Sequence, residues 1–348
     1  MLLLLALAVP ATADAAQRSS LFGINSWALL EEDAQIAQLR DMPVGGYRMP
    51  FSWAYAEREA GAPYDFWSHD RVVAGAARLG VRVLPILSDS PQWVRGSSTR
   101  VGEPPEPGYE MSRFEAFAAA AAERYGAGGS FWREHPELPR LPVRSWQVWN
   151  EPNLPVYWPS GPDAAQYVAL LRATGRGIRS VDPGAEIVTA GLPDSRLGVP
   201  LRQYVAAIYE AGGAGAFDAL AVNPYGLDAT GVLDTVRLVR RVANTNGDNP
   251  YVWVTELGWA TGGPQSTFLV READQARLLE QTLLALARRR DALRIRGVVY
   301  FNWRDSTPYA GGRDFFGLHT GLLRLRGSPK PAFRAYKKVA ETLGLLPD

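Results

Sequence analysis

Short apolar runs alternate along the chain with longer segments in which apolar residues recur every three or four positions. The short runs are rich in β-branched and aromatic residues, which predicts buried strands, while the longer segments predict amphipathic helices. The predicted strands are 21–28, 46–53, 81–89, 143–150, 186–193, 218–226, 251–259 and 296–303. The helical patterns include 111–126, 163–181, 271–290 and 331–344. Eight strand–helix units in one chain predict an α/β fold, a single-domain (β/α)8 TIM barrel.

The alternative to a barrel is a doubly wound parallel sheet. That fold is expected to carry a glycine-rich phosphate loop after an early strand, and neither G-x-G-x-x-G nor a Walker motif occurs in the sequence. With 348 residues, 47% of them hydrophobic and 21% charged, the composition is typical of a soluble globular protein with a large core. The formal net charge of +1 predicts no nucleic-acid partner. Cysteine is absent, which excludes disulfides, thiolate metal sites and a cysteine nucleophile.

The first 16 residues have the pattern of a signal peptide. A short apolar core rich in leucine precedes Ala13-Asp14-Ala15, which fits the small-x-small rule of cleavage sites. No Lys or Arg precedes the leucines, which departs from that pattern, and the apolar run is too short to span a bilayer. We expect cleavage near Ala15 or Ala16, a barrel domain over 17–348, no integral membrane segment after cleavage, and a secreted protein of the extracellular space or cell envelope.

Two connections between predicted elements are long. Residues 90–110 follow the third strand and therefore lie on the carboxyl face of the barrel, where active sites of this fold are built. We expect this connection to contact a substrate. Residues 126–142 precede the fourth strand and belong to the opposite face, so we assign them no function.

Two glutamates follow predicted strands on opposite sides of the barrel. Glu151 comes directly after the fourth strand, and Glu256 lies in the seventh, where Val252, Trp253 and Val254 give way to Thr255. Strands four and seven are three steps apart in a ring of eight, so their carboxyl ends face each other across the mouth. Two facing carboxylates are what cleavage of a glycosidic bond requires, because the leaving oxygen is protonated while the anomeric carbon is attacked or stabilised.

The two carboxyl groups need different protonation states, which neighbouring groups provide. Arg48, in the second strand, is a candidate positive neighbour for Glu256, and Tyr225, after the sixth strand, is a candidate hydroxyl donor to it. The aromatic content agrees with sugar chemistry, because a flat ring complements the apolar face of a pyranose. Four tryptophans fall at predicted strand ends, although each alone is equally compatible with a place in the core: Trp53, Trp149, Trp259 and Trp303.

Other chemistries have little support in the sequence. His69, His135 and His319 are scattered, without the spacing of a metal site, so we predict no metal and no cofactor. A Ser-His-Asp hydrolase is not favoured either, because no G-x-S-x-G motif occurs and none of the histidines falls at a predicted strand end.

Several motifs together resemble the clan A glycoside hydrolases, the large group of retaining (β/α)8 glycosidases, and are similar to members of families 39 and 5. Asn150-Glu151-Pro152 resembles the acid/base signature, and "TELGW" at 255–259 resembles the nucleophile signature. Further similar stretches are "YRMPFSW", "LPILSDSPQW", "AVNPYG", "YFNWRDS" and "SPKPAFRAYKKV". The resemblance extends over essentially the whole chain after the leader.

The resemblance implies a role for each matching residue. Glu151 would be the general acid/base, and Glu256 the nucleophile that forms a covalent glycosyl intermediate. Asn150 would bind the sugar 2-hydroxyl, while Arg48 and Tyr225 would orient and ionise Glu256. The remaining candidate substrate-binding residues are Trp303, as the floor of the cleavage subsite, with Trp53, Trp259 and Asn223. Asn223 is a departure, because the family usually has a histidine at that position.

We therefore interpret the sequence as a secreted retaining glycosidase that cleaves β-glycosidic bonds of an oligo- or polysaccharide by double displacement, and we expect a monomer. Two alternatives use the same groove. One is a non-hydrolytic carbohydrate-binding barrel, against which the presence of both glutamates argues. The other is a transglycosylase, in which a sugar intercepts the covalent intermediate instead of water. Either alternative would act in cell-wall or exopolysaccharide metabolism.

Overall fold

The computed structural model describes residues 21–26, 38–40, 42–96, 102–308 and 312–344. The predicted leader, residues 1–16, lies outside the described residues. Part of the 90–110 connection, residues 97–101, lies outside them too.

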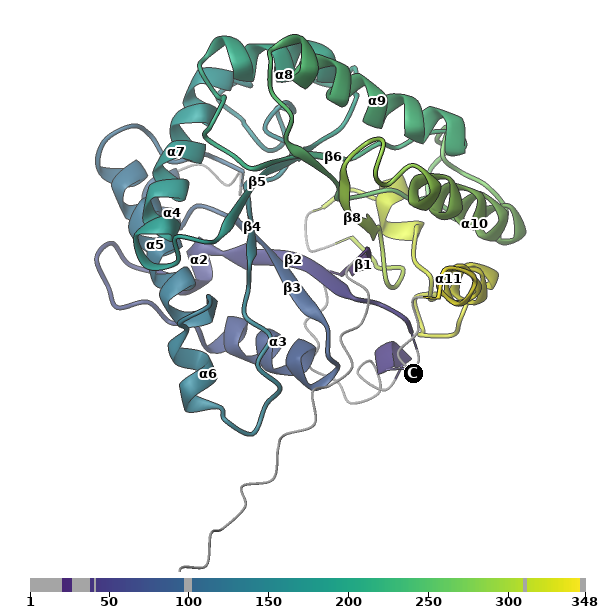
Figure 1. Cartoon of the computed structure of the whole chain (residues 1–348), viewed down its shortest axis with the longest axis horizontal. Helices are drawn as coiled ribbons and strands as arrows, with labels where there is room; N and C mark the ends of the chain where they lie inside the picture. Colours follow the sequence, from purple (N-terminus) through teal and green to yellow (C-terminus); the bar gives the residue numbers. More distant parts are fainter. Residues whose placement is uncertain (1–20, 27–37, 41, 97–101, 309–311, 345–348) are drawn as a thin grey trace, which may run out of the picture.

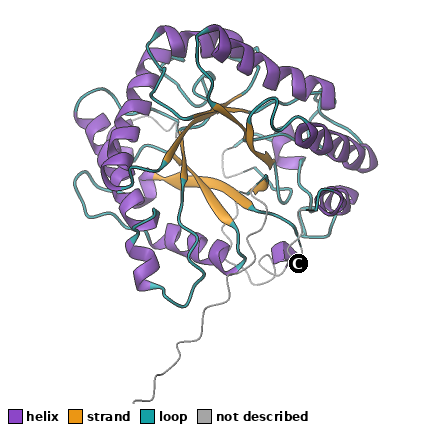
Figure 2. Cartoon of the chain, in the orientation of Figure 1, coloured by secondary structure: helices purple, strands orange, loops and turns teal. Residues whose placement is uncertain are grey.

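Eight parallel strands form a closed barrel in the order in which they occur in the chain, with helices around it (Figures 1 and 2). This confirms the predicted TIM barrel. The strands are β1 (Phe22–Asn25), β2 (Gly46–Ser52), β3 (Arg82–Ser88), β4 (Ser145–Val148), β5 (Glu186–Leu192), β6 (Ala219–Val222), β7 (Tyr251–Val254) and β8 (Ile295–Tyr300). Seven of them lie inside the predicted runs, and β8 begins one residue before its run.

The helices fill the connections between the strands. Among the described residues they are α2 (Trp53–Ala56), α3 (Trp67–Arg78), α4 (Gln92–Arg95), α5 (Tyr109–Tyr125), α6 (Ser130–Glu134), α7 (Ala164–Val181), α8 (Leu201–Glu210), α9 (Ala229–Thr245), α10 (Glu272–Arg288), the 3-10 helix η1 (Phe316–His319) and α11 (Pro331–Thr342). The bounds of α5, α7, α10 and α11 agree with the predicted helices to within two residues. The connection 126–142, to which the sequence analysis assigned no function, contains the short helix α6.

Two of the long helices begin at aspartates that cap them. The Asp163 carboxylate accepts hydrogen bonds from the backbone N–H groups of Ala165 and Gln166 at the start of α7. Asp228 does the same for Thr230 and Gly231 at the start of α9. Such caps satisfy backbone donors that have no partner inside the helix. They fix where the connections that follow β4 and β6 end, and those connections carry part of the barrel mouth.

The hydrophobic core has an outer and an inner part. The large cluster lies between the strands and the surrounding helices, and its largest members are tryptophans and tyrosines. The inner cluster consists of Leu84, Val188, Ala219 and Ala221, with Trp253 packed against it. These residues come from β3, β5, β6 and β7, so they fill the barrel axis below its carboxyl end. The barrel interior is therefore packed, and chemistry is confined to its two ends.

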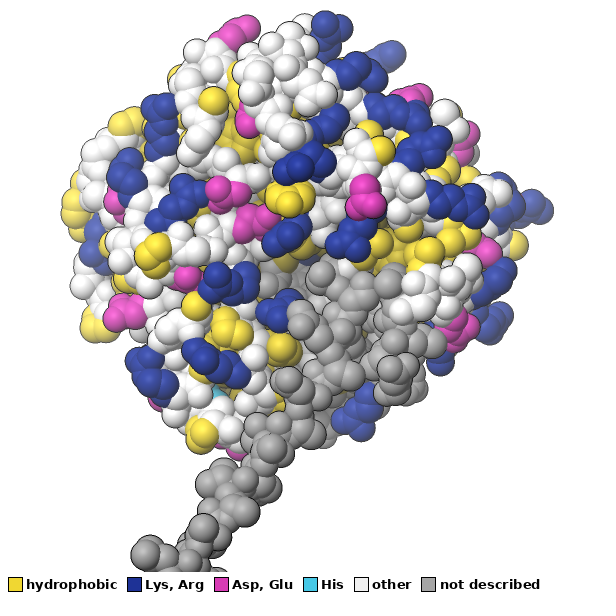
Figure 3. All heavy atoms as spheres, in the orientation of Figure 1, with side chains coloured by type: hydrophobic (Ala, Val, Ile, Leu, Met, Phe, Trp, Pro, Cys, Tyr) yellow, Lys and Arg dark blue, Asp and Glu magenta, His cyan; other side chains and the backbone are white. Residues whose placement is uncertain are grey.

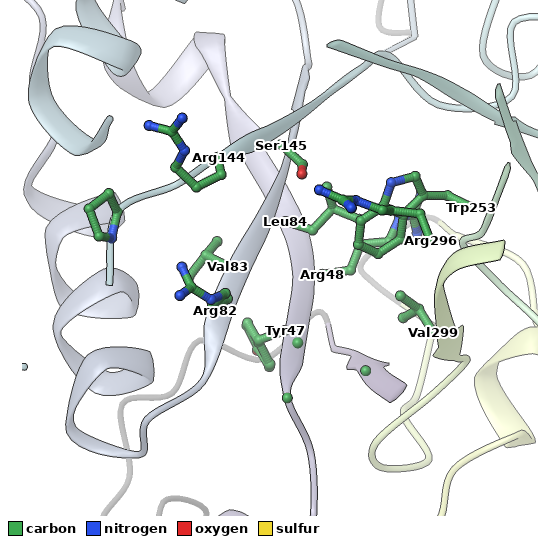
Figure 4. Close-up of a pocket in the computed structure, with 14 residues that line it drawn as sticks. Tyr47, Arg48, Arg82, Val83, Leu84, Arg144, Ser145, Trp253, Arg296 and Val299 are labelled. Atoms are coloured by element: carbon green, nitrogen blue, oxygen red, sulfur yellow. The ribbon is translucent and has the colours of Figure 1, made fainter. Parts of the chain in front are cut away.

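The amino ends of the strands enclose a cavity of about 280 Å³ that four arginines line, Arg48 from inside the barrel and Arg82, Arg144 and Arg296 from its amino end. In Figure 4, Arg82 and Arg144 lie on one side of this cavity and Arg296 on the other. On the face seen in Figure 3, basic and acidic side chains are interspersed and form no single patch. In the part of the chain that the structure describes, no helix has both the length and the apolar character needed to cross a membrane.

Candidate active site

Glu256 follows β7 by two residues and lies at the carboxyl end of the barrel, with 6% of its surface exposed. Both of its carboxylate oxygens accept hydrogen bonds. Arg48 Nη1 donates to Oε1 at 2.7 Å, and the Tyr225 hydroxyl donates to Oε2 at 2.8 Å. The two donors come from β2 and from the connection after β6, so the barrel closes around this carboxylate from both sides.

Arg48 organises the mouth beyond its contact with Glu256. Its side chain is 1% exposed and uses its other hydrogen-bonding positions on neighbouring strands. Nε donates to Gln147 Oε1 at 2.7 Å, and Nη1 also donates to Asn25 Oδ1 at 2.9 Å. Nη2 donates to Asn150 Oδ1 at 3.0 Å. A buried guanidinium with this many charge-assisted bonds is rigid, so it fixes Glu256 and Asn150 relative to each other.

Sequence reasoning missed Asn25 and Gln147. Each is a polar residue that directly follows an apolar one, Ile24 or Trp146, in a predicted strand, and each is almost fully buried in the structure. A polar side chain that interrupts a buried strand needs a partner. That signal indicates an inward-facing network without revealing which residue it serves.

Glu151 reaches the mouth through an unusual backbone. β4 ends at Val148, three residues before Glu151, and both Trp149 and Glu151 have left-handed φ angles, +68° and +43°. Non-glycine residues with positive φ are uncommon and concentrate at functional sites. The turn lets the Trp149 ring stay in the core while the Glu151 carboxyl points to the mouth, where 9% of the residue is exposed.

Asn223 links Glu151 to the opposite wall of the barrel. Its Nδ2 donates to Glu151 Oε1 at 2.7 Å, and its Oδ1 accepts from the Thr255 hydroxyl at 2.7 Å. Thr255 immediately precedes Glu256, so the two glutamates are connected through one carboxamide and one residue of backbone. Asn223 was expected to bind substrate, but the residue is fully buried and contacts Glu151.

Gly191 in β5 provides the space for that contact. A Cβ at this position would lie 2.2 Å from Asn223 Oδ1 and 2.4 Å from Thr255 Oγ1. A side chain at this position would therefore displace Asn223 and Thr255, which are hydrogen-bonded to each other. The sequence alone marks Gly191 only as one glycine in a strand-like run, which is a weak sign of close approach.

Several neighbouring groups shift the pKa of the Glu151 carboxyl. Its pKa is raised to about 8, first by burial and then by the negative charge of Glu256, against the hydrogen bond from Asn223 and the positive charge of Arg48, which lower it. A carboxyl group with such a pKa holds its proton at neutral pH. Glu256, in contrast, is hydrogen-bonded on both oxygens by donors. The two carboxyl groups of the pair therefore have different surroundings, which is the asymmetry that acid-assisted displacement requires.

The three tryptophans that were expected to bind sugar lie in the hydrophobic core. Trp53, Trp259 and Trp303 are each at most 1% exposed. The Trp53 Nε1 donates to Glu57, the Trp259 Nε1 donates to the Gly226 carbonyl, and the Trp303 ring packs on Phe333. In this structure none of these rings offers a free face to a sugar, because strand-end position alone does not distinguish rings that line the mouth from rings beneath it.

Aromatic side chains that the sequence did not single out line the mouth instead. Phe268, between β7 and α10, and Phe316, in η1, pack on Tyr225 with ring centroids 5.8 Å and 5.3 Å away. All three rings are partly exposed. We call Tyr225, Phe268 and Phe316 the aromatic wall. It stands beside Glu256, because Tyr225 is one of that residue's two donors.

No group of three or more His, Asp or Glu side chains that could hold a metal ion occurs among the described residues. His69 is buried among aromatic rings, and burial lowers its pKa to about 4. His319 pairs with Asp314 at 2.7 Å. These histidines take part in local packing and pairing, away from the Glu151–Glu256 network.

No family model matches the sequence, and no curated protein is similar to it in sequence. Solved structures with the same fold include a family 39 glycoside hydrolase from the gut symbiont Bacteroides cellulosilyticus, with 20% identity and a TM-score of 0.68, which covers 96% of this chain and 66% of that chain. A family 39 enzyme from Xanthomonas axonopodis pv. citri has 18% identity and a TM-score of 0.66, with 95% and 68% covered.

Xylanase 10B from Thermotoga petrophila, solved with xylobiose, has 14% identity and a TM-score of 0.61, with 95% of this chain and 96% of that chain covered. The chain thus spans about two-thirds of the length of the family 39 enzymes and almost all of the xylanase. At these identities the likeness establishes the shared barrel fold. It agrees with the fold that the sequence motifs implied.

Proposed function

We propose that the protein is a glycoside hydrolase that cleaves β-glycosidic bonds of an oligo- or polysaccharide with retention of configuration. The observation that carries the proposal is the asymmetric carboxyl pair. Glu151 is buried with a raised pKa beside Asn223, and Glu256 accepts hydrogen bonds on both oxygens from Arg48 and Tyr225.

In the first step the protonated Glu151 gives its proton to the glycosidic oxygen, and that oxygen leaves with the bond electrons. Glu256 attacks the anomeric carbon and forms a glycosyl ester. In the second step Glu151, now a carboxylate, takes a proton from water, which attacks the anomeric carbon and releases Glu256. Arg48 and Tyr225 hold the Glu256 carboxylate in place, so little reorganisation is needed as its charge changes.

Asn150 is the proposed contact to the substrate at the cleavage site. Arg48 donates to its Oδ1, which fixes the orientation of the carboxamide. Its Nδ2 is then the atom that donates a hydrogen bond to a sugar hydroxyl. The names of the structural relatives support the substrate class, since a family 39 glycoside hydrolase and a xylanase are among them. Secretion and removal of residues 1–16 belong to the same proposal, because polymeric glycans are met outside the cell.

The first test is release of reducing sugar by residues 17–348 from a panel of plant, fungal and bacterial β-glycans and aryl β-glycosides. Glu256→Ala serves as the inactive control, with Asp234→Asn, an exposed α9 residue, as the control for a changed charge. We expect release by the wild type, and a loss of at least about a thousandfold in Glu256→Ala. If the wild type bound one glycan but released no sugar from it, the proposed hydrolysis would be wrong and the protein would be a carbohydrate-binding barrel.

The stereochemical claim has its own test. Retention requires the two carboxyl groups to be about 5 to 5.5 Å apart, against about 6.5 to 9.5 Å for inversion. The anomer formed first is identified by NMR within the opening minutes of the reaction. A first-formed α-anomer from a β-linked substrate would disprove the double displacement. Longer products formed at high substrate concentration would indicate transglycosylation through the same intermediate.

A further inference from the structure

A small cavity of about 60 Å³ opens at the carboxyl ends of β2, β3 and β4, beside the carboxyl pair. Its walls are of two kinds. Ile86 and Trp149 are apolar, while Asp89, Asn150 and Tyr157 bring polar atoms. Asn150 connects it to the proposed nucleophile, because Arg48 donates to both Asn150 and Glu256. The cavity is therefore joined to the reacting centre through two hydrogen bonds.

Asp89 follows the last residue of β3 and is held firmly. Its φ of +64° is left-handed, which makes it one of three non-glycine residues of this kind at the mouth, with Trp149 and Glu151. The hydroxyls of Ser52 and Ser88 donate to its carboxylate. Its backbone carbonyl accepts from Ala54 N–H at 2.8 Å. The carboxylate is thus preorganised by β2, β3 and the start of α2, although it takes no part in the mechanism above.

The two serine hydroxyls leave part of the carboxylate unused. An ionised carboxylate has about four acceptor positions, and the serines occupy two. Asp89 is partly exposed and lines the cavity, so the remaining positions are available to a ligand there. The edge of a sugar ring fits this site. Its hydroxyls donate hydrogen bonds to the carboxylate, and its C–H groups pack against Ile86 and Trp149.

The size of the cavity limits what enters it. A volume of about 60 Å³ is small beside the roughly 300–1,000 Å³ of pockets that take whole ligands. It accepts one hydroxyl-bearing edge or a hydroxymethyl group, while the rest of the ring stays in the mouth above. Gly102, from the connection after β3, closes it against Tyr157: a Cβ on Gly102 would lie 2.7 Å from the Tyr157 Cα.

We propose that Asp89 is a specificity-determining residue that accepts hydrogen bonds from hydroxyls of the sugar bound beside Glu151 and Glu256, and that it selects neutral sugars over uronic acids. This inference rests on the proposed function and deepens it. Selection against uronates follows from charge. Asp89 and Glu256 bring two carboxylates to this position. Arg48 is already paired with Glu256, and Arg95, whose charge also acts on Asp89, donates to the Ser90 carbonyl, so a further carboxylate on the substrate is repelled.

The electrostatics of neighbouring groups agree with this arrangement. Burial raises the pKa of Asp89 to about 6, although the serine hydroxyls lower it. Burial also raises the pKa of the Tyr157 hydroxyl far above its usual value, and the negative charges of Glu151, Glu256 and Asp89 contribute to the same shift. Tyr157 therefore keeps its hydroxyl proton and can donate it in a hydrogen bond. All three carboxyl groups lie near enough to Tyr157 to affect its pKa.

The test measures binding, so that it does not depend on turnover. Glu256→Gln, which retains the shape of the site, is titrated calorimetrically with the neutral glycan that the activity panel selects and with its uronate counterpart. The same titrations are made with Asp89→Asn and Asp89→Ala added, and with Asp234→Asn as the matched exposed aspartate. Thermal unfolding of each variant shows whether it is folded. Asn is nearly isosteric, so it serves where the alanine variant does not fold.

We expect the affinity for the neutral glycan to fall at least about tenfold in Asp89→Asn, since the amide replaces acceptor positions by a donor. The preference for the neutral glycan over the uronate should shrink in the same variant. Unchanged affinities in Asp89→Asn would overturn the inference, as would binding of no neutral glycan by Glu256→Gln. If the wild type hydrolyses nothing yet neutral glycans bind through Asp89, the proposed hydrolysis fails while this inference stands.

Discussion

The two ends of this barrel differ in how their charged groups are used. At the carboxyl end, a cavity of about 60 Å³ lies beside a network in which Arg48, Asn223 and Tyr225 all point to two carboxyl groups. At the amino end, a cavity of about 280 Å³ is lined by arginines on opposite sides. The larger cavity is not where the chemistry converges.

The arginines of the amino end have local partners. Arg144 lies 3.5 Å from Asp182 and donates to the Gly184 carbonyl, and Arg296 lies 3.4 Å from Glu186. Their side chains are 44% and 51% exposed, against 1% for Arg48. An exposed guanidinium is solvated and screened, whereas a buried one must bond its partners rigidly. Convergence and burial of polar groups, more than empty volume, therefore distinguish the proposed catalytic end from the other end.

The largest expected effect is the loss of activity in Glu151→Gln, together with the loss of its pH dependence. The proposed acid must be protonated, so kcat/KM should be high below the Glu151 pKa of about 8 and fall as the pH rises through it. In Glu151→Gln, kcat/KM for a natural substrate should fall at least about a hundredfold, and the basic limb should disappear. The measurement is a pH profile of both proteins. A wild-type limb that persists in Glu151→Gln would assign the proton to another group.

Gly191→Ala should act on the same acid without touching it. The added Cβ displaces the Asn223 carboxamide, which weakens the hydrogen bond to the Glu151 carboxylate. Because that bond lowers the Glu151 pKa, its loss raises the pKa and moves the basic limb to higher pH. We expect kcat to fall about tenfold. Asn223→Ala is the matched variant and should shift the limb in the same direction. A lower kcat with an unmoved limb would indicate a merely structural effect.

Phe316→Leu should have a smaller effect on the aromatic wall. Phe316 packs edge-to-face on Tyr225, with the rings at 88°, and such contacts contribute about 0.5–1.5 kcal/mol beyond area burial. Loss of the ring loosens the Tyr225 hydroxyl on Glu256, so kcat should fall about threefold to tenfold. Phe316→Tyr, which keeps the aromatic ring, should retain most of the wild-type kcat. Equal losses in the two variants would contradict a positioning role for the ring.

Arg296→Ala should have the smallest effect. Its ion pair with Glu186 is half exposed, and pairs of this kind contribute about 0–1 kcal/mol to stability. The midpoint of chemical unfolding should therefore shift only slightly, and kcat/KM should change less than about twofold. If this variant lost activity as Gly191→Ala is expected to, the amino-end cavity would be coupled to the mouth and the contrast between the two ends would fail.

Much of the architecture follows from local patterns. A buried parallel strand needs apolar residues on both faces, and an amphipathic helix needs one apolar stripe, so both are recognisable without knowing their partners. The positions of Glu151 and Glu256 at the ends of such runs placed them at the mouth. The exact strand ends were less predictable, because left-handed residues such as Trp149 and Glu151 end the ladder inside an apolar run.

The contacts within the site, unlike the strands and helices, could not be predicted from local patterns. The sequence by itself determined the barrel, the order of its strands and the two facing glutamates, because short-range periodicity carries that information. Only the tertiary structure decided that Asn223 serves Glu151, that Gly191 makes room for it, and that Phe268 and Phe316 line the mouth in place of Trp53 and Trp259. These relations join residues that are tens of positions apart or more. They depend on side-chain direction and burial, which exist only once the strands have closed into a ring.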